Sequence, residues 1–520
     1  MLIKNGKARQ IADLSFRHDE ESISVNMMTS SAADTELPCR FGDVLTRLLT
    51  RIWNLRITYP DLDIVITAND VKGCFRQIKH HPDVMGFFSY IINGILYLQC
   101  GQTFGSDFSP SNWECPRLVI EQLAEALFAD TTLRDKHRQY LDKLKWHSAL
   151  GTTKGHFTPA IADSVHVGVK NPDGTLKNTP QDAFVDDIVL AEVNSVPRVE
   201  QAIAASIESI FTILGDPCPE ARQDPVSWDK LFDMVIGFCN KILGVVINTR
   251  TMTVRTPENY VQDTVSLMTT TWQAKRRSFT ISEIEQLTGC LGHIAQTSPW
   301  LRFIMSEVYT SIRHCLKLSR DILVTHSAQF RRALKMAKQC ATNATEERHK
   351  SFGTSQAAKM VHRNKKRFYI NPTLRLELDI ILDALTAPWI DMHRPIGHMV
   401  PSRDARGSAY SNSSLHAARG YSFKLQFWWY FEWPEEVQRL TLRYVVKYKT
   451  DSGDIVSINV LKYAAMIITY VAGYHVMVQV DPSARDPYPL MELWADNTSA
   501  ETWILKASKA SFIGRALSRI

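Results

Sequence analysis

Two stretches decide the fold of this 520-residue chain: Leu62-Asp-Ile-Val-Ile-Thr-Ala-Asn-Asp70 and Ala183-Phe-Val-Asp-Asp-Ile-Val-Leu-Ala191. The first is a β-rich run that ends in an aspartate, and Gly73 follows it to allow a sharp change of direction. The second has apolar arms on both sides of Asp186 and Asp187, which is the pattern of a tight hairpin with acidic residues at its tip. The sequence therefore predicts carboxylates at the rim of a sheet.

Crowded carboxylates restrict the chemistry of such a site. Their mutual repulsion is unfavourable unless cations neutralise it, and Mg²⁺ is a hard ion that prefers oxygen ligands. Two such ions about 4 Å apart can activate an attacking hydroxyl and stabilise a leaving phosphate, so phosphoryl transfer to a nucleotide is the natural reaction. Taken alone, an Asp-Asp pair between apolar residues is more often a solvated turn, and a single aspartate at the end of a strand is equally ordinary.

Composition sets broad limits on the protein class. Hydrophobic residues make up 45% of the chain and charged residues 22%, which is typical of a soluble protein of mixed α/β structure. The net charge of +6 is a weak argument for a polyanionic partner. The nine cysteines show no metal-ligand spacing, and Met1 to Ala12 lacks an apolar secretory core, so an intracellular place is expected, nuclear or cytoplasmic. The uncharged stretch from Tyr463 to Val480 is interpreted as a buried helix that runs into a strand, without a membrane.

Shifts in pattern divide the chain into four regions. Residues 1–255 mix β-type runs with helical segments, whereas residues 256–345 are helical. In the helical region, Thr280-Ile-Ser-Glu283 reads as a capping box, and it opens a helix with apolar residues on one face: Ile284, Leu287, Leu291 and Ile294. Residues 346–395 are expected to be a linker, and strand and helix signals return in residues 396–520.

Basic residues cluster beside aromatic ones in two places. Lys275, Arg276 and Arg277 follow Trp272, and a second cluster lies within residues 363–369. Such a mixture suits phosphate contact combined with base stacking. Taken alone, each cluster is more often an ordinary solvated face.

Three motifs in series resemble the reverse transcriptases of retrotransposons, of the tyrosine-recombinase or LTR-like type. The run Asp70-Val-Lys-Gly-Cys-Phe-Arg-Gln-Ile78 resembles the first palm motif of that family. Phe104-Gly-Ser-Asp-Phe-Ser-Pro110 resembles the second, and Phe184-Val-Asp-Asp187 resembles the aromatic-x-Asp-Asp signature. The resemblance implies an α+β fold shaped as a right hand, with fingers, a palm built on an antiparallel sheet, and a helical thumb and connection.

The resemblance also implies roles for individual residues. Asp70 and Asp186 would be catalytic ligands of both metal ions, with Asp187 in support and the Val71 carbonyl as a further oxygen ligand. Phe75 occupies the position of the steric gate, where an aromatic ring would press against a ribose 2′-hydroxyl and favour deoxynucleotides. The alternative for Phe75 is a plain core residue.

Further contacts follow from the same resemblance. Phe104 and Gly105 would help to bind the substrate, although retroviral enzymes begin this segment with Gln. Lys7 and Arg9 would meet the incoming triphosphate from the fingers, and the cluster Lys275, Arg276 and Arg277 would grip the duplex backbone.

The C-terminal region resembles an α/β ribonuclease H domain that has lost its metal site. Ser402 to Ser408, with Asp404, matches its first strand motif, and Leu493 to Ala500, with Asp496, matches its later acidic motif. The helix between them carries Lys462 where the family places a metal-binding Glu, and a cation there would repel magnesium. We expect a folded domain that is incomplete or degenerate, without ribonuclease H activity.

The leading hypothesis is an RNA-directed DNA polymerase, a nucleotidyltransferase that uses two Mg²⁺ ions, or Mn²⁺ in their place. Its partners would be an RNA template, a DNA primer or duplex, and deoxynucleoside triphosphates. The alternative is a catalytically decayed nucleic-acid-binding protein that descends from a mobile element. A standalone nuclease is opposed by Lys462.

Overall fold

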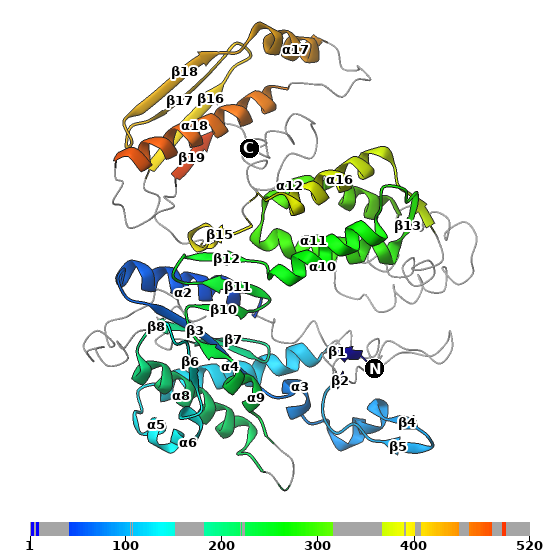
Figure 1. Ribbon diagram of the computed structural model, residues 1–520, viewed down its shortest axis with the longest axis vertical. Coiled ribbons are helices and arrows are strands. Elements are labelled where there is room, and N and C mark those ends of the chain that lie inside the picture. Colours follow the sequence, from blue (N-terminus) through cyan, green and yellow to red (C-terminus); the bar gives the residue numbers. More distant parts are fainter. Residues whose placement is uncertain are drawn as a thin grey trace. The chain divides into compact units, whose positions relative to one another are not determined.

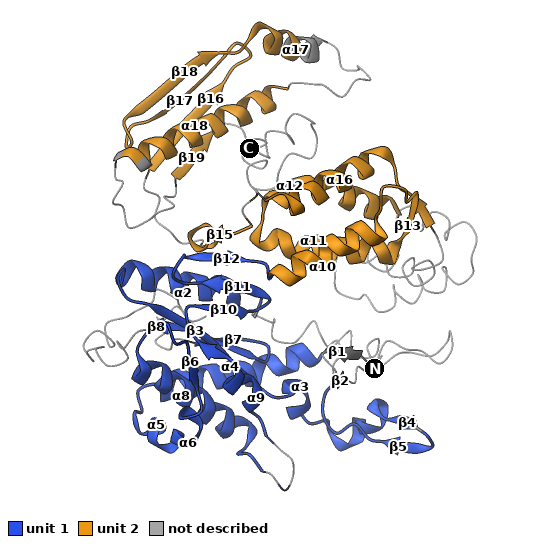
Figure 2. Ribbon diagram, viewed as in Figure 1, with its two compact units in different colours: residues 1–257, 316–366 blue, residues 258–315, 367–520 orange. Residues whose placement is uncertain are grey.

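The computed structural model divides the chain into two compact units (Figure 2). Unit 1 comprises Met1–Pro257 with Leu316–Lys366, and unit 2 comprises Glu258–Cys315 with Arg367–Ile520. The structure describes residues 2–4, 7–9, 41–103, 106, 108–150, 181–218, 220, 224–315, 367–388, 390, 392–400, 407–446, 457–480 and 491–495. Both units mix helices and strands, in agreement with the mixed class that the sequence predicted.

Unit 1 contains short helices and strands around one central sheet (Figure 1). Its strands are β1 (Leu2–Lys4), β2 (Lys7–Arg9), β3 (Ile64–Asp70), β4 (Tyr90–Ile92), β5 (Ile95–Tyr97), β6 (Lys145–Trp146), β7 (Gln181–Phe184), β8 (Asp187–Val193), β9 (Val235–Ile236), β10 (Cys239–Ile242), β11 (Val245–Asn248) and β12 (Thr253–Arg255). Its helices are η2 (Phe41–Asp43), α2 (Val44–Thr58), α3 (Cys74–Gln77), η3 (Pro82–Phe88), α4 (Ser109–Leu127), α5 (Thr132–Lys136), α6 (Arg138–Leu141), α8 (Val196–Leu214) and α9 (Trp228–Asp233).

The central sheet has the order β3-β8-β7, and both pairings are antiparallel. Strand β3 pairs with β8 along its whole length, from Ile64 opposite Val193 to Asp70 opposite Asp187. Its residues are β-branched or small and almost all buried, which suits a strand covered on both faces. The strand predicted before Asp70 and the hairpin predicted around Asp186 are therefore both confirmed.

Helices cover the sheet and form the main core of unit 1. Helix α2 packs on β7 and β8, and helices α4 and α8 pack against each other. Side chains of α4 and α8 share one apolar cluster with the sheet residues Val65, Ile188 and Leu190. Burial of this much apolar surface is the dominant stabilising term, so the sheet rim that carries the aspartates is rigidly supported.

Part of unit 2 is a group of helices: α10 (Glu258–Thr271), α11 (Ile281–Thr297), α12 (Trp300–Ile304) and α16 (Pro372–Thr386), with β13 (Ser278–Thr280), β14 (Arg367–Tyr369), β15 (Arg394–Pro395) and η5 (Ile396–Met399). The predicted capping box is present, because the side chains of Thr280 and Glu283 each bond the other residue's backbone N–H. The apolar face predicted for α11 is fully buried: Ile284, Leu287, Leu291 and Ile294. Of the predicted linker, residues 346–366 lie outside the described part of the chain. The rest was wrongly predicted, because β14, α16 and β15 lie within residues 367–395, where the Asn371 side chain caps α16.

The other described part of unit 2 is a sheet of order β18-β17-β16-β19, formed by β16 (Gly407–Ser413), β17 (Ala417–Ser422), β18 (Phe427–Glu432) and β19 (Met491–Ala495). Strands β16 and β19 are parallel and the other neighbours are antiparallel. Helix α18 (Ile458–Val480) packs along one face of this sheet, and α17 (Glu435–Val446) follows β18.

Helix α18 corrects one prediction. The sequence predicted a helix that runs into a strand before Val480, but the helix continues to that residue. Gly473 lies inside the helix, and a side chain there would collide with the Met491 sulphur at 2.3 Å, so this glycine allows α18 and β19 to pack closely. The stretch Ile458–Met477 is long and apolar enough to cross a membrane by length and composition alone, and in this structure it lies along the sheet.

Candidate active site

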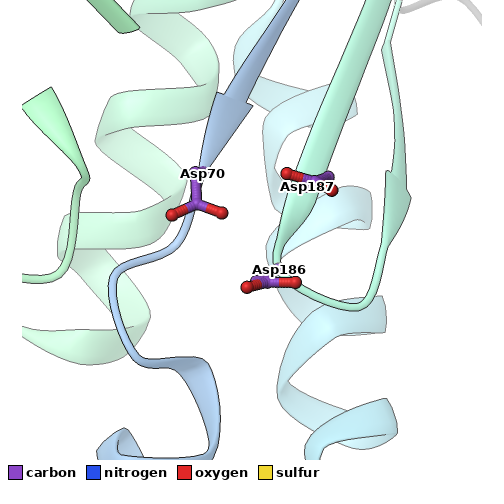
Figure 3. Close-up of side chains that lie close together, drawn as sticks. All are labelled: Asp70, Asp186 and Asp187. Atoms are coloured by element: carbon purple, nitrogen blue, oxygen red, sulfur yellow. The ribbon is translucent and has the colours of Figure 1, made fainter. Parts of the chain in front are cut away.

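Three aspartates converge where strands β3 and β8 meet. Asp70 is the last residue of β3 and pairs with Asp187, the first residue of β8. The Val71 N–H donates to the Asp186 carbonyl over 2.8 Å, which fixes the turn against the end of β3. Carboxylate oxygens of Asp70, Asp186 and Asp187 all lie within 4.8 Å of one another, and Figure 3 shows the side chains directed toward a common space.

The turn that carries Asp186 is strained. Val185 has a φ of 54°, a left-handed backbone that a β-branched residue rarely adopts and that costs on the order of 1–3 kcal/mol. The indole N–H of the fully buried Trp113, on α4, donates to the Val185 carbonyl over 2.7 Å. This bond holds the strained peptide, so Trp113 positions the adjacent Asp186.

A buried guanidinium holds the preceding strand. Arg117, also on α4, donates to the Ala183 carbonyl of β7 at 3.1 Å. Its remaining N–H groups bind Glu114 at 2.9 Å and Glu121 at 2.8 Å, so the buried charge is paired. Losing one partner of such a buried pair would leave an uncompensated charge, so the pairing keeps the Arg117 guanidinium in this position.

A segment distant in sequence holds the end of β3. The Ser227 N–H donates to the Asp70 carbonyl at 2.9 Å, and the Lys72 N–H donates to the Pro225 carbonyl at 2.8 Å. The Asn69 side chain accepts the Asp70 N–H at 2.7 Å. These bonds fix the Asp70 backbone and place α9, which begins at Trp228, beside it.

Helix α9 brings a cation to the aspartates. The Lys230 ammonium lies 2.5 Å from Asp70 Oδ1, and its own side chain is 54% exposed. Although partial burial opposes it, the bond to Asp70 and the charges of Asp187 and Asp186 raise the pKa of Lys230 above its ordinary value. Lys230 is therefore charged over the whole physiological pH range.

The crowding is visible in the ionisation of Asp187. Burial first, and then the negative charges of Asp186 and Asp70, raise the pKa of Asp187 to about 6, and the nearby Lys230 opposes this shift only in part. Both causes penalise the ionised form of Asp187, and a nearby cation would relieve them. The arrangement therefore favours additional cations.

The structure places other predicted residues in different settings. Phe75, the predicted steric gate, lies on α3, is 7% exposed and packs in the main core of unit 1 with Val71. Lys7 and Arg9 lie on β2, which pairs with β1, and nothing is described of their side chains. Phe104 and Gly105 lie outside the described residues.

The basic cluster of unit 2 is divided in its contacts. Lys275 and Arg277 are exposed. Arg276 instead binds the Ser278 and Thr271 carbonyls at 2.7 and 2.6 Å, pairs with Glu283 at 2.5 Å and lies over the Trp272 ring. Its guanidinium holds the start of α11 in place.

The predicted ribonuclease H residues lie mainly outside the described part. Lys462 is on α18 and half-buried, whereas Asp404 and Asp496 are not described. Strand β16 begins at Gly407, three residues after Asp404, so the quoted motif precedes most of the strand. Among the described residues, the only group of three or more His, Cys, Asp or Glu side chains close enough to hold an ion is Asp70 with Asp186 and Asp187.

Sequence reasoning missed Lys230, Trp113 and Arg117. Lys230 lies 160 positions from Asp70, and no local pattern in its helix marks it as a partner. Trp113 and Arg117 are one turn apart on α4, but an amphipathic helix pattern does not reveal which backbone carbonyls such side chains will reach. Only the tertiary structure shows these contacts.

Comparisons with known proteins give distant structural likenesses alone. No protein-family model matches the chain, and no curated protein sequence matches it. Solved structures of a foamy viral protease-reverse transcriptase are similar: the complex with RNA/DNA hybrid at a TM-score of 0.30, the dRH form with double-stranded DNA at 0.32, and the complex with double-stranded DNA at 0.29. Each is 11% identical over 84% of this chain, which spans 44%, 57% and 68% of those chains respectively. Likenesses of this degree do not establish a shared fold.

Proposed function

We propose that the chain is an RNA-directed DNA polymerase whose nucleotidyl transfer uses Asp70, Asp186 and Asp187. The observation that carries the proposal is the convergence of the three carboxylates, whose oxygens lie within 4.8 Å of one another at the junction of β3 and β8. A binding protein gains nothing from crowded negative charges at a rigid rim. A phosphoryl-transfer enzyme needs them to hold cations.

The donor set fits magnesium. All three side chains offer hard carboxylate oxygens, and burial together with the charges of Asp186 and Asp70 raises the pKa of Asp187. Asp70, Asp186 and Asp187 would hold the ions, and the Val71 carbonyl is the further ligand that the resemblance implies. When bound, two ions would lower the charge on the attacking and leaving oxygens of an in-line displacement.

The surrounding residues position these ligands. Trp113 and Arg117 hold the hairpin that carries Asp186, and the Ser227 N–H holds the Asp70 backbone. The ammonium of Lys230 offsets part of the carboxylate charge, so the cluster can form before metal arrives. A rigid, preorganised ligand set loses little free energy to reorganisation during the reaction.

The remaining parts of the right-hand architecture belong to the same proposal. The β3-β8-β7 sheet would be the palm, and helices α10, α11, α12 and α16 would form the thumb and connection. The exposed Lys275 and Arg277 would contact the duplex backbone. An RNA template, a DNA primer and deoxynucleoside triphosphates are the proposed partners.

Primer extension tests this function directly. The full chain is mixed with a DNA primer annealed to an RNA template, deoxynucleotides and Mg²⁺, and compared with Asp186→Asn/Asp187→Asn. Asp229→Asn is the matched control, because Asp229 is exposed on α9 next to Lys230 and is not part of the cluster. Extension by the wild-type chain and by Asp229→Asn, but not by the double variant, supports the proposal.

A second outcome identifies the alternative. If no protein extends the primer while all of them bind the primed template with equal affinity, the chain is a decayed nucleic-acid-binding protein. Extension that persists in the double variant contradicts the assignment of the catalytic residues. Circular dichroism of each variant establishes that the fold is intact in either case.

A further inference from the structure

One face of the β18-β17-β16-β19 sheet carries a continuous row of aromatic rings. The strand register places Trp494 opposite Tyr410, Tyr410 opposite Tyr421, and Tyr421 opposite Trp428, so the row crosses four adjacent strands. The Tyr410 and Tyr421 rings stack at 5.2 Å with 15° between their planes, and Tyr410 and Trp494 stack at 6.3 Å with 16°. With neighbouring strands about 4.8 Å apart, the row is about 14 Å long.

This face is exposed and differs from the buried face. Helix α18 packs on the opposite face, which presents small and apolar side chains such as Ala409 and Met491. On the exposed face Trp428 is 79% and Trp494 50% exposed, values far above those of core aromatic residues. No Val, Ile, Leu or Met occupies the outward positions of the four strands, so the face lacks the branched side chains that fill a protein core.

A cation lies beside the row. Arg419 pairs across the strands with Asn412 on one side and Tyr430 on the other, and each of the three lies two residues along its strand from the aromatic row. These side chains, with Ser414 and neighbouring backbone, line a hollow of about 220 Å³. The Arg419 side chain is exposed, and no described carboxylate lies within ion-pair distance of its guanidinium.

We infer that this aromatic row and Arg419 form a binding site for single-stranded nucleic acid. Unpaired bases stack on flat aromatic faces whatever their identity, and Trp428 and Trp494, at the two ends of the row, present exposed rings for this contact. The guanidinium of Arg419 provides the charge that a phosphate requires beside the stacked bases. Because protein interfaces are also rich in aromatic residues and arginine, failure of the oligonucleotides to bind this face would assign it to a protein partner instead. The inference does not depend on the proposed polymerase function, because it uses none of the aspartates.

Binding of short oligonucleotides to the full chain tests the site. Fluorescence anisotropy measures the affinity for a labelled twelve-nucleotide oligo-dT, for oligo-U of the same length, and for a twelve-base-pair duplex. Trp428→Ala/Trp494→Ala is expected to weaken single-strand binding by about 25-fold or more and to leave duplex binding unchanged, because paired bases do not expose their faces. Arg419→Gln is expected to weaken single-strand binding and to reduce its salt dependence.

A matched control and a second readout keep the test decisive. Tyr470→Ala removes an aromatic ring of similar exposure from α18, on the opposite side of the sheet, and should not change binding. Acrylamide should quench Trp428 and Trp494 in the free chain, and the oligonucleotide should protect them. Equal affinity of the wild-type chain and the double tryptophan variant overturns the inference. Rings already shielded in the free chain also overturn it, because another segment or a second copy then covers the face.

The two proposals fail separately. Asp186→Asn/Asp187→Asn should abolish primer extension and leave single-strand affinity intact. Trp428→Ala/Trp494→Ala should give the opposite pattern for the single-stranded oligonucleotides. Loss of oligonucleotide binding in the aspartate variant would assign that binding to the other site and overturn this one.

Discussion

In two sheets of this molecule, pairing between neighbouring strands brings together different kinds of side chain. In the β3-β8-β7 sheet, the register sets Asp70 opposite Asp187 at the rim, with Asp186 in the adjoining turn. In the β18-β17-β16-β19 sheet, the same kind of cross-strand pairing aligns aromatic rings. Strands β16 and β19 contain a single carboxylate, Glu492, which pairs with Ser408.

The difference shows what turns a sheet rim into a candidate metal site. Carboxylates must be brought together by register and then held against their repulsion, and both conditions are met only in the first sheet among the described residues. There Trp113 and Arg117 reach across from α4 to fix the hairpin, and Lys230 supplies a counter-charge. Aromatic pairs in the second sheet attract one another and need no such support.

The largest effect is expected from removing the Asp70 carboxylate, which is a proposed ligand of both metal ions in the first sheet's site. Asp70→Asn should abolish the heat of Mg²⁺ binding in titration calorimetry and lower nucleotide incorporation by about a thousandfold or more, because several kcal/mol of charge stabilisation is lost. Glu492→Gln, which removes the carboxylate of β19 in the second sheet, is the matched control and should change neither. Equal losses in both variants would erase the distinction between the sheets.

The next largest effect is expected from removing the hydrogen bond that supports the hairpin. Trp113→Phe keeps most of the ring but removes the N–H that binds the Val185 carbonyl, leaving a buried acceptor without its partner. The free energy of unfolding should fall by about 1–3 kcal/mol, with incorporation reduced in addition. Denaturant unfolding and primer extension measure the two effects. An unchanged rate in a folded Trp113→Phe protein would show that the strained turn needs no support.

The crowding of the three carboxylates predicts an unusual dependence of the chain's stability on pH. Because the pKa of Asp187 is raised to about 6, the folded chain holds a proton there that the unfolded chain releases at lower pH. Without metal, stability should therefore fall as pH rises from about 4 to about 6, by about 2 kcal/mol, and level off above. Unfolding curves of the wild-type chain and Asp187→Asn, recorded in a chelator, isolate this contribution. Parallel curves across that range would contradict the crowded arrangement.

A smaller effect is expected from removing the counter-charge of Lys230. Lys230→Met should destabilise the metal-free chain at neutral pH by about 1 kcal/mol, since its pairing with Asp70 is partly exposed to solvent. Added Mg²⁺ should then raise the melting temperature more than it does in the wild-type chain. Lys241→Met, on the exposed side of β10, is the control and should leave the metal response unchanged. A weaker metal response in Lys230→Met would contradict the role of a counter-charge.

The region that contains the second sheet is expected to show no nuclease activity. Lys462 stands on α18, a helix without an acidic residue, so we predict no Mg²⁺-dependent cleavage of RNA within an RNA/DNA hybrid. Gel analysis of labelled RNA measures this. Cleavage that survives Asp186→Asn/Asp187→Asn would require a metal site in the second region and contradict the comparison.

Local pattern was sufficient to predict several elements. The β-branched run before Asp70, the hairpin around Asp186 and the capping box at Thr280 all depend on residues close in sequence. The pairing of β3 with β8, which sets Asp70 opposite Asp187, was not predicted, because the two strands are far apart in sequence.

Tertiary contacts account for what the sequence did not reveal. Lys230 reaches Asp70 through a helix placed by backbone bonds at Pro225 and Ser227, which no periodicity encodes. The end of α18 was wrongly predicted, because the sequence does not show that Gly473 lies inside the helix and allows it to pack closely against Met491. The aromatic row was missed because its members come from four separate strands.

The most direct test of the central claim is a crystal of the chain grown with Mn²⁺, a primed template and an incoming nucleotide, with anomalous diffraction measured from the metal. The account predicts two anomalous peaks about 4 Å apart, in contact with the carboxylates of Asp70 and Asp186, and an ammonium of Lys230 displaced from Asp70. A map without metal at these carboxylates, in which Lys230 still holds Asp70, would contradict it.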